Sequence, residues 1–182
     1  MEFSQSRTFK NIQDAFEGEL KTSTLYEIYG LRARQEGFIQ ISDVYNIVSG
    51  FEREHAKVWY RLIHENNLPS TFQNLTESAL IEDKRSNVTY REYGNIAREE
   101  GFTAIGALFD GVANIELNQN VIFQNFASNM QANKVFCKTE EALWICINCG
   151  NIMGRTCAPE ICPICSFPQG YYQVYDSNAT SI

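Results

Sequence analysis

Four cysteines near the end of the chain have the spacing of a metal site. They lie in the motifs "CINC" at 146–149 and "CPIC" at 162–165. Two C-x-x-C turns can bring four thiolates around one tetrahedral ion, and the loop between the motifs is short enough to close easily. Four sulfurs in a tetrahedron suit both iron and zinc, so the spacing leaves the metal open. The predicted ligands are Cys146, Cys149, Cys162 and Cys165.

Two further cysteines, Cys137 and Cys157, lie outside these motifs. We expect them to be structural residues or free thiols. Gly150 follows the first motif, where a residue that readily takes positive φ suits the turn. Ser166 stands at the corresponding place after the second motif, so we expect that turn to have less conformational freedom.

Acidic residues interrupt apolar stripes of helical periodicity in the first two-thirds of the chain. One stripe consists of Ile41, Tyr45, Val48, Glu52, His55, Trp59 and Leu62. Another consists of Ile105, Phe109, Val112, Glu116, Gln119, Phe123 and Phe126. Glu19 and Glu82 interrupt similar apolar faces of two other helical segments. These acidic side chains therefore lie on helix faces that should be apolar in a bundle core.

A bound cation is the simplest reason to place several carboxylates in such a core. Burying an ionised carboxylate without compensation is costly, and burying several together is worse. The spacing of Glu52 and His55 puts an oxygen and a nitrogen ligand on one helix face. The alternative is a polar network in which arginines or tyrosines satisfy the carboxylates. Carboxylates on four helices together with a histidine favour a metal site, present or ancestral.

The helical part of the chain is an internal repeat with an offset of 64 residues. Gly30 matches Gly94, and "EGF" at 36–38 recurs at 100–102. The glycine of each "EGF" is typical of a left-handed helix C-terminus followed by an apolar contact. Each copy is therefore predicted to form a helical hairpin, and two such hairpins form a four-helix bundle. The predicted helices span residues 8–36, 38–65, 73–100 and 102–131.

Composition divides the chain near Asn133. All six cysteines and three of the four prolines follow it, so we predict a helical domain at 1–132 and a small metal module at 133–182. A net charge of −7 argues against nucleic-acid or anionic-membrane partners. The polar start of the chain does not resemble a signal peptide, and no apolar run reaches membrane-spanning length. We therefore expect a cytoplasmic protein with reduced cysteines.

Several motifs resemble the rubrerythrin family. They are "DAFEGE" at 14–19, "EREHAK" at 52–57, "REEGF" at 98–102 and "FPQGYY" at 167–172. The resemblance covers nearly the whole chain. It implies a mainly α fold, in which a ferritin-like four-helix bundle is followed by a small rubredoxin-like β/loop metal domain. It also implies that electrons pass from a four-cysteine iron to a di-iron site of a partner chain, which reduces hydrogen peroxide to water.

The resemblance also implies a set of bundle ligands. For the third helix, the strict repeat offset selects Asp83. The family has one extra residue in this helix, consistent with a helical bulge, and its alignment selects Glu82 instead. We prefer Glu82. The implied catalytic and metal-binding residues of the bundle are then Glu19, Glu52, His55, Glu82 and Glu116.

Two positions depart from the family pattern. A further glutamate is replaced by Arg85, and the second histidine is replaced by Gln119. Arginine is always protonated and cannot bind a metal, and glutamine is a weak neutral ligand. We expect the positive charge of Arg85 to replace that of a metal ion. The sequence leaves open whether the bundle holds two, one or no metals. The alternative functions are then an electron carrier or scaffold with an intact four-cysteine site, or a structural zinc protein.

The connection between the two hairpins is short. The polar stretch "ENNLPSTF" at 65–72 spans at most about 26–29 Å when fully extended, which barely covers the length of a bundle. We therefore predict either a nearly straight linker or a homodimer that exchanges hairpins. An electron-donating reductase is the other expected partner.

Overall fold

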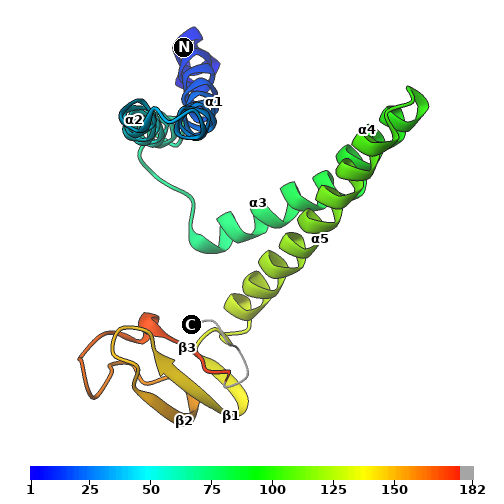
Figure 1. Cartoon of the computed structure of the whole chain (residues 1–182). Coiled ribbons are helices and arrows are strands. Elements are labelled where there is room, and N and C mark those ends of the chain that lie inside the picture. The colour runs from blue at the N-terminus through cyan, green and yellow to red at the C-terminus, as the bar shows by residue number, and fades with distance from the viewer. Residues whose placement is uncertain (177–182) are drawn as a thin grey trace. The chain divides into compact units, whose positions relative to one another are not determined.

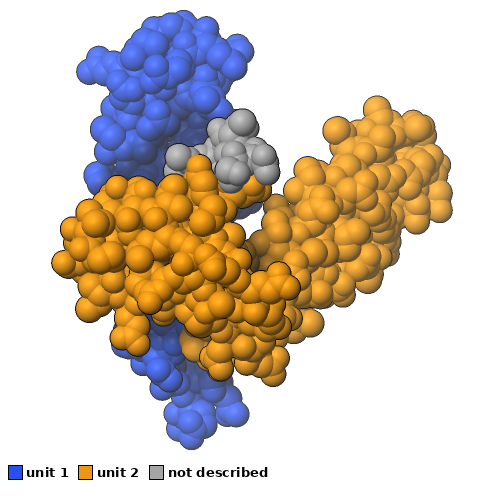
Figure 2. Space-filling model, turned by 90° about the horizontal axis from the view of Figure 1, so that it is seen from below, with its two compact units in different colours: residues 1–69 blue, residues 70–182 orange. Residues whose placement is uncertain are grey.

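The computed structural model describes residues 1–176, so the last six residues of the predicted 133–182 domain lie outside the described part. The chain divides into two compact units, Met1–Pro69 and Ser70–Ile182, which are coloured separately in Figure 2. Each unit is described by itself below. No helix in the described part of the chain is long and apolar enough to cross a membrane.

The first unit is a helical hairpin of α1 (Arg7–Gln35) and α2 (Ile39–Ile63), preceded by the short η1 (Phe3–Gln5) (Figure 1). We call it hairpin 1. Ser6 caps α1, because its side-chain oxygen accepts a hydrogen bond from the backbone N–H of Phe9 at 3.0 Å. The cap gives α1 a defined start close to the predicted residue 8.

The second unit begins with a hairpin in which a long interrupted helix runs beside α5 (Thr103–Gln131). We call it hairpin 2. Its first helix consists of α3 (Thr71–Lys84), a π-helical turn η2 (Arg85–Thr89) and α4 (Tyr90–Glu99). The π-helical turn accommodates one extra residue without ending the helix, as the helical bulge predicted for this segment requires.

Both hairpins turn at a left-handed glycine, as predicted. Gly37 and Gly101 have φ values of 87° and 88°. In the first turn, the N–H of Phe38 bonds to the carbonyl of Ala33 at 2.9 Å, and Gly37 bonds to Arg34 at 3.1 Å. This pair of bonds satisfies two carbonyl groups that the helix end would otherwise leave unpaired. The same two bonds recur at Gly101 and fix where each hairpin reverses.

Small residues form the seam between the helices of each hairpin. In hairpin 1 the buried residues are Ser23, Gly30, Ala33, Ser42, Ser49 and Ala56. In hairpin 2 they are Ala79, Ser86, Gly94, Ala97, Gly106, Ala113 and Asn120. Most of these positions correspond through the 64-residue offset, so the repeat conserves the surface along which the paired helices approach each other.

Gly106 allows the closest helix approach in hairpin 2, and its replacement by alanine is expected to be destabilising. A Cβ atom there would lie 2.9 Å from the Gly94 carbonyl oxygen. We expect Gly106→Ala to lower the free energy of unfolding of the full chain by about 1–3 kcal/mol. At Gly111 a Cβ meets nothing within 4 Å, so Gly111→Ala is the control and should stabilise by about 0.5–1 kcal/mol. Urea denaturation measures both; equal effects would contradict the close approach.

An ion-pair cluster near the same seam predicts a pH-dependent contribution to stability. The Asp110 carboxylate lies 2.8 Å from Arg98 and 3.4 Å from Arg91. Its hydrogen bond with Arg98 is the main cause that lowers the pKa of Asp110. A lowered carboxyl pKa stabilises the folded state above the unfolded pKa of about 3.9, and this stabilisation is lost as the pH falls below it.

We therefore expect Asp110→Asn to lower the melting temperature at pH 7, with the difference from the unmodified chain shrinking as the pH falls below about 4. Thermal unfolding followed by circular dichroism from pH 7 to pH 3 measures this. Asp14→Asn is the control, because Asp14 is exposed on α1 and has no ion pair within the described part of the chain. A difference that persists unchanged at pH 3 would exclude the ion-pair explanation.

A small antiparallel sheet follows α5. Its strands β1 (Cys137–Cys146), β2 (Ile152–Cys157) and β3 (Tyr172–Val174) have the order β2-β1-β3, and η3 (Gln169–Tyr171) precedes β3. The core of this part consists of Trp144, Cys146, Ala158, Cys162 and Tyr172. The predicted class of a mainly α fold with a small β/loop module is confirmed. The predicted boundary at 132/133 stays a prediction.

The linker between the hairpins does not run straight. Residues 64–66 form a turn in which Glu65 and Asn66 have positive φ values of 49° and 60°. The N–H of Asn66 donates to the carbonyl of Arg61 at 2.8 Å and draws the chain back toward the end of α2. Only residues 67–70 lie between this turn and α3. The predicted straight linker is therefore wrong, since the turn consumes part of its length.

Candidate metal centres

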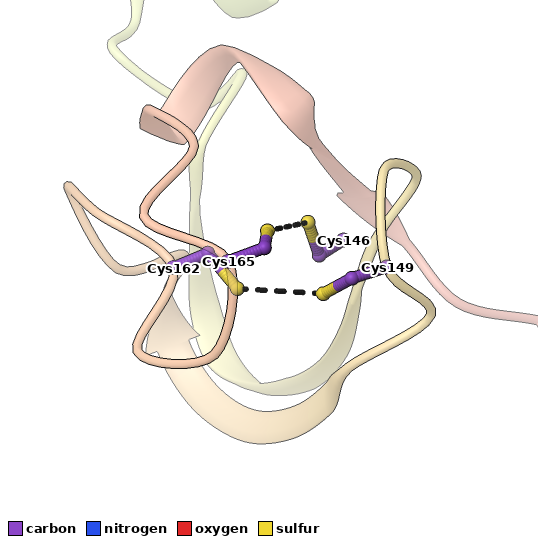
Figure 3. Close-up of side chains that lie close together, drawn as sticks. All are labelled: Cys146, Cys149, Cys162 and Cys165. Carbon is purple, nitrogen blue, oxygen red and sulfur yellow. Dashed lines mark hydrogen bonds between the residues drawn. The ribbon is translucent and has the colours of Figure 1, made fainter.

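The four predicted cysteines converge on one point. Cys146 ends β1 and Cys149 lies in the turn after it, whereas Cys162 and Cys165 lie in the loop before η3. Their sulfur atoms lie within 4.8 Å of one another (Figure 3). The Cys146–Cys165 and Cys149–Cys162 sulfur pairs are each 3.7 Å apart. Metal–sulfur bonds of about 2.3 Å give a tetrahedron with edges of about 3.8 Å. The sulfur separations therefore fit a single tetrahedral ion.

The surroundings of Cys162 favour its thiolate form, whereas a backbone hydrogen bond with Asn151 is outweighed by neighbouring cysteines that raise the pKa of Cys149. Burial acts to raise the pKa of the Cys162 thiol, but hydrogen bonds from Tyr172 and from nearby backbone N–H groups outweigh it and lower the pKa to about 6. A thiolate is the form that binds metal. Asn151 donates a hydrogen bond to the Tyr172 hydroxyl at 3.2 Å and so orients it. The sequence pattern did not single out Tyr172 or Asn151, because neither lies within a cysteine motif.

Each cysteine motif is followed by a residue in the left-handed region. Gly150 has a φ of 76°, as its position predicted, and Ser166 has a φ of 61°. A residue with a side chain adopts this conformation at a cost of about 1–2 kcal/mol. The second turn thus has the same shape as the first, although its residue is less suited to it.

Hairpin 1 gathers three predicted bundle ligands. The His55 Nδ1 atom lies 3.6 Å from Glu19 and 3.5 Å from Glu52. One ligand atom from each of the three residues lies within 4.8 Å of the other two. Both carboxylates are mostly buried, whereas the histidine side chain is 56% exposed. Two oxygens and one nitrogen at this spacing can hold one cation, which would have room for further ligands.

The two carboxyl groups of this cluster share hydrogen-bonding interactions. A hydrogen bond with Glu52 is the main cause that lowers the pKa of Glu19. The same bond is the main cause that raises the pKa of Glu52. Because two carboxylates at this distance repel each other, one proton between them or one bound cation relieves the repulsion.

Hairpin 2 brings together two carboxylates and a guanidinium. Burial, followed by the neighbouring Glu116 carboxyl, raises the pKa of Glu82. Arg85 lies 3.6 Å from one carboxylate oxygen of Glu82, and the other oxygen is buried without a hydrogen-bond partner in the described chain. Gln119 is exposed on α5. The charge of Glu82 is thus partly balanced by an arginine of its own helix, whereas the sequence had suggested Glu19 or Glu52 as the carboxylates that Arg85 neutralises.

The π-helical turn explains why Glu82, rather than Asp83, lies beside Glu116. Beyond the turn the buried residues follow the 64-residue offset, but within it buried Ser86 corresponds to Ser23, an offset of 63. Under that offset Glu82 corresponds to Glu19. Asp83 instead accepts hydrogen bonds from Asn87 at 2.8 Å and from Asn120 at 3.2 Å. One inserted residue therefore rotates the acidic positions of α3 relative to α4.

The structure excludes the free-thiol alternative for the two remaining cysteines. Cys137 and Cys157 form a disulfide, so they are not free thiols. They face each other in the register of β1 and β2. Sequence spacing alone could not pair them, because cysteine connectivity depends on which strands become neighbours.

Comparisons with known proteins bear on these sites. The rubrerythrin family model matches residues 10–118, and the rubrerythrin rubredoxin-like domain model matches residues 144–173. Rubrerythrin of Nitratidesulfovibrio vulgaris is 34% identical over 95% of this chain and 96% of that protein. The chain belongs to the rubrerythrin family. Rubrerythrin of Clostridium perfringens is 33% identical over 93% of this chain and 95% of its own length.

Solved structures of nigerythrin are also similar. The mixed-valence form shares 23% identity over 96% of this chain and 89% of that one, with a TM-score of 0.35. The family assignment rests on the sequence matches. Membership of the rubrerythrin family makes the chain a non-haem iron redox protein with a ferritin-like part and a rubredoxin-like part.

The two kinds of site differ in how well they fit the metals of a rubrerythrin. The four cysteines fit iron, because their sulfurs have the separation of one tetrahedral ion. Hairpin 1 offers three donors at one point. Hairpin 2 does not fit a second iron, because Arg85 pairs with Glu82 and Gln119 stands where hairpin 1 has a histidine.

Proposed function

We propose that the chain reduces hydrogen peroxide to water, with electrons that enter at the four-cysteine iron and pass to metal held by the bundle glutamates. The observation that carries this proposal is the four-cysteine tetrahedron in a chain related over nearly its full length to rubrerythrins. Iron bound there would supply one-electron chemistry. Zinc would fit the same four sulfurs but would carry no electrons.

The protein residues have separate roles in this proposal. Exposed Cys149 presents one edge of the four-cysteine centre to solvent, where an electron-donating reductase can approach. Buried Cys146 and Cys162 keep water from the opposite side. In hairpin 1, Glu19, Glu52 and His55 offer three donor atoms at one point, which would hold a metal. Reduction of peroxide to two waters consumes two protons as well as two electrons.

The test is an anaerobic stoichiometry experiment. The apo chain is titrated with ferrous iron, bound iron is counted, and hydrogen peroxide is then added in small portions. Oxidation of the bound iron by half an equivalent of peroxide per iron, with fast kinetics, is the expected result. Ferrous protein that is left unoxidised by peroxide would refute the proposal.

A second candidate is an electron carrier in which the helical part serves as a scaffold. The ion pair of Arg85 with Glu82 favours it, because a fixed guanidinium beside a predicted ligand repels a cation. In the same titration this candidate predicts one iron per chain, bound by cysteines, and no rapid reaction with peroxide. Partner titration with a small electron-transfer protein would then show reversible oxidation and reduction.

We propose that the working form is a homodimer that exchanges hairpins. Both α2 and α5 have exposed apolar residues at helical spacing, and the positions agree through the 64-residue offset. They include Val44, Phe51 and Val58 on α2, and Leu108, Ile115 and Ile122 on α5. Such stripes need a partner surface. A second copy of the chain offers a matching apolar surface. The turn at residues 64–66 shortens the linker that a single chain would need to dock its own two hairpins.

Lengthening the linker tests the exchange. Insertion of several Gly and Ser residues after Asn67 should raise the monomer fraction in sedimentation experiments, because a relaxed hinge allows one chain to satisfy its own stripes. The same insertion after Asn133 is the control and should leave the assembly state unchanged. We also propose a cytoplasmic location, since four metal-binding thiolates suit a reducing compartment.

A further inference from the structure

The disulfide lies at the margin of the sheet, apart from the four-cysteine centre. Cys137 and Cys157 are the outermost pair of the β1–β2 ladder, and the register between them and the next pair, Ala142 and Arg155, is irregular. Cys157 is exposed and Cys137 is half-buried. Neither residue belongs to the groups that can hold a metal. Cys137 also precedes the region that matches the rubredoxin-like domain model.

Cys137 and Cys157 each line a cavity that small reactants can enter. Cys157 lines one of about 280 Å³ together with Arg155 and Glu160. Cys137 lines another of about 340 Å³ together with Phe136 and Gln169. A structural disulfide in a small domain is usually shielded, whereas exposed disulfides are the ones open to exchange with thiols.

The fold does not depend on this bond for closure. In the folded chain the two strands are also held together by the regular part of the ladder, from Ala142 paired with Arg155 to Ile145 paired with Ile152. Disulfides act mainly by restricting the unfolded chain, so opening this bond removes no strand pairing from the folded state. The bond can therefore open without loss of the core around Trp144 and Cys162.

The two thiols would remain neighbours after the bond opens. The backbone N–H of Ala158 donates to the carbonyl of Phe136 at 2.8 Å, which joins the two strands at the residues beside the cysteines. Phe136 also packs against the buried core of this part of the chain. A dithiol held in this way re-forms its disulfide with little entropic cost.

We infer that Cys137 and Cys157 form a second redox centre, a dithiol–disulfide couple that hydrogen peroxide oxidises and small dithiols reduce. In the oxidising direction one thiolate attacks a peroxide oxygen, the O–O bond breaks, and a sulfenic acid and one water form. The second thiolate attacks the sulfenic sulfur, the S–S bond forms and a second water leaves. Two thiols and one peroxide thus give one disulfide and two waters.

The reverse direction needs a dithiol as electron donor. Its thiolate attacks one sulfur of the pair to form a mixed disulfide, and its second thiol releases the reduced pair. In a reducing compartment, disulfides are usually transient, catalytic or redox-sensing. This couple goes beyond the proposed function, because it transfers electrons through sulfur and uses no metal ligand.

Peptide mapping of the full-length, iron-loaded chain tests the couple. The protein is treated anaerobically with dithiothreitol, trapped with N-ethylmaleimide and digested, and a second sample receives one equivalent of peroxide before trapping. We expect alkylation of both cysteines in the first sample and a linked Cys137–Cys157 peptide in the second. Iron bound by the four cysteines should be unchanged in both. A disulfide that resists dithiothreitol until iron is lost would overturn the inference.

Single substitutions provide the matched controls. Cys157→Ser and Cys137→Ser should each keep the four-cysteine iron, lose the linked peptide and leave the remaining cysteine open to over-oxidation by peroxide. If either variant fails to fold, the bond is structural and the inference is wrong. The experiment measures the masses of cysteine-containing peptides and not the oxidation of iron. Failure of this inference is therefore distinct from failure of the proposed peroxide reaction.

Discussion

Replacing Cys162 with serine is expected to remove the four-cysteine iron and the reduction of peroxide together. The Cys162 sulfur is buried, lies 3.7 Å from Cys149 and has a pKa lowered to about 6, so it is held as a thiolate donor at neutral pH. A serine hydroxyl stays protonated and is a poor ligand for iron. Because metal binding is coupled to folding in small metal domains, loss of the metal should also lower the melting temperature of the rubredoxin-like part.

Metal analysis and visible absorption of the oxidised protein measure the loss of iron. Cys157→Ser is the matched control, because it removes a cysteine from the same part of the chain without touching the four ligands. The control should retain its iron at this centre. A Cys162→Ser protein that keeps one iron per chain at an unchanged spectrum would contradict the tetrahedral site.

The second large expected effect is the binding of an additional metal ion when the two missing ligand residues are restored in hairpin 2. We expect the double variant Arg85→Glu, Gln119→His to bind one more ferrous ion per chain than the unmodified protein. Arg85 lies 3.6 Å from Glu82, so its replacement removes a positive charge from beside a predicted ligand. The histidine would repeat the Glu52–His55 spacing at Glu116, three residues before position 119.

Anaerobic titration with ferrous iron, followed by metal analysis after desalting, measures the gain. Arg85→Gln with Gln119 unchanged separates charge from ligand, because it removes the guanidinium but adds neither a carboxylate nor an imidazole. We expect this variant to bind no more iron than the unmodified chain. If the double variant binds no additional metal either, hairpin 2 lacks more than these two residues. The explanation by guanidinium replacement would then fail.

Residues that act locally made the fold predictable from sequence. Gly37 and Gly101 determine where each hairpin reverses, because the bonds around them involve only residues within one turn. The helical bulge was also predictable, since an extra residue in the repeat implies one and the structure contains the π-helical turn at Arg85–Thr89. Glu82 as a metal ligand stays a prediction.

Features that depend on contacts between distant segments were not predictable in this way. The disulfide joins two cysteines that are 20 residues apart in the sequence, and it depends on the register of β1 and β2. The turn at residues 64–66 depends on positive φ at Glu65 and Asn66, and a glutamate gives no signal for that conformation. The exposure of Gln119 likewise depends on how α5 is rotated in its hairpin.

The small-residue seam of hairpin 1 has a consequence for synthesis of the chain on the ribosome. Every buried residue of that seam lies between Ser23 and Ala56, so both helices have their partner before α3 has been translated. At about 5–20 residues per second, translation of residues 70–182 takes roughly 6–23 seconds. During that interval the nascent hairpin presents Val44 and Phe51 to its neighbours on the same messenger. Polysomes thus offer an early opportunity for two nascent chains to meet.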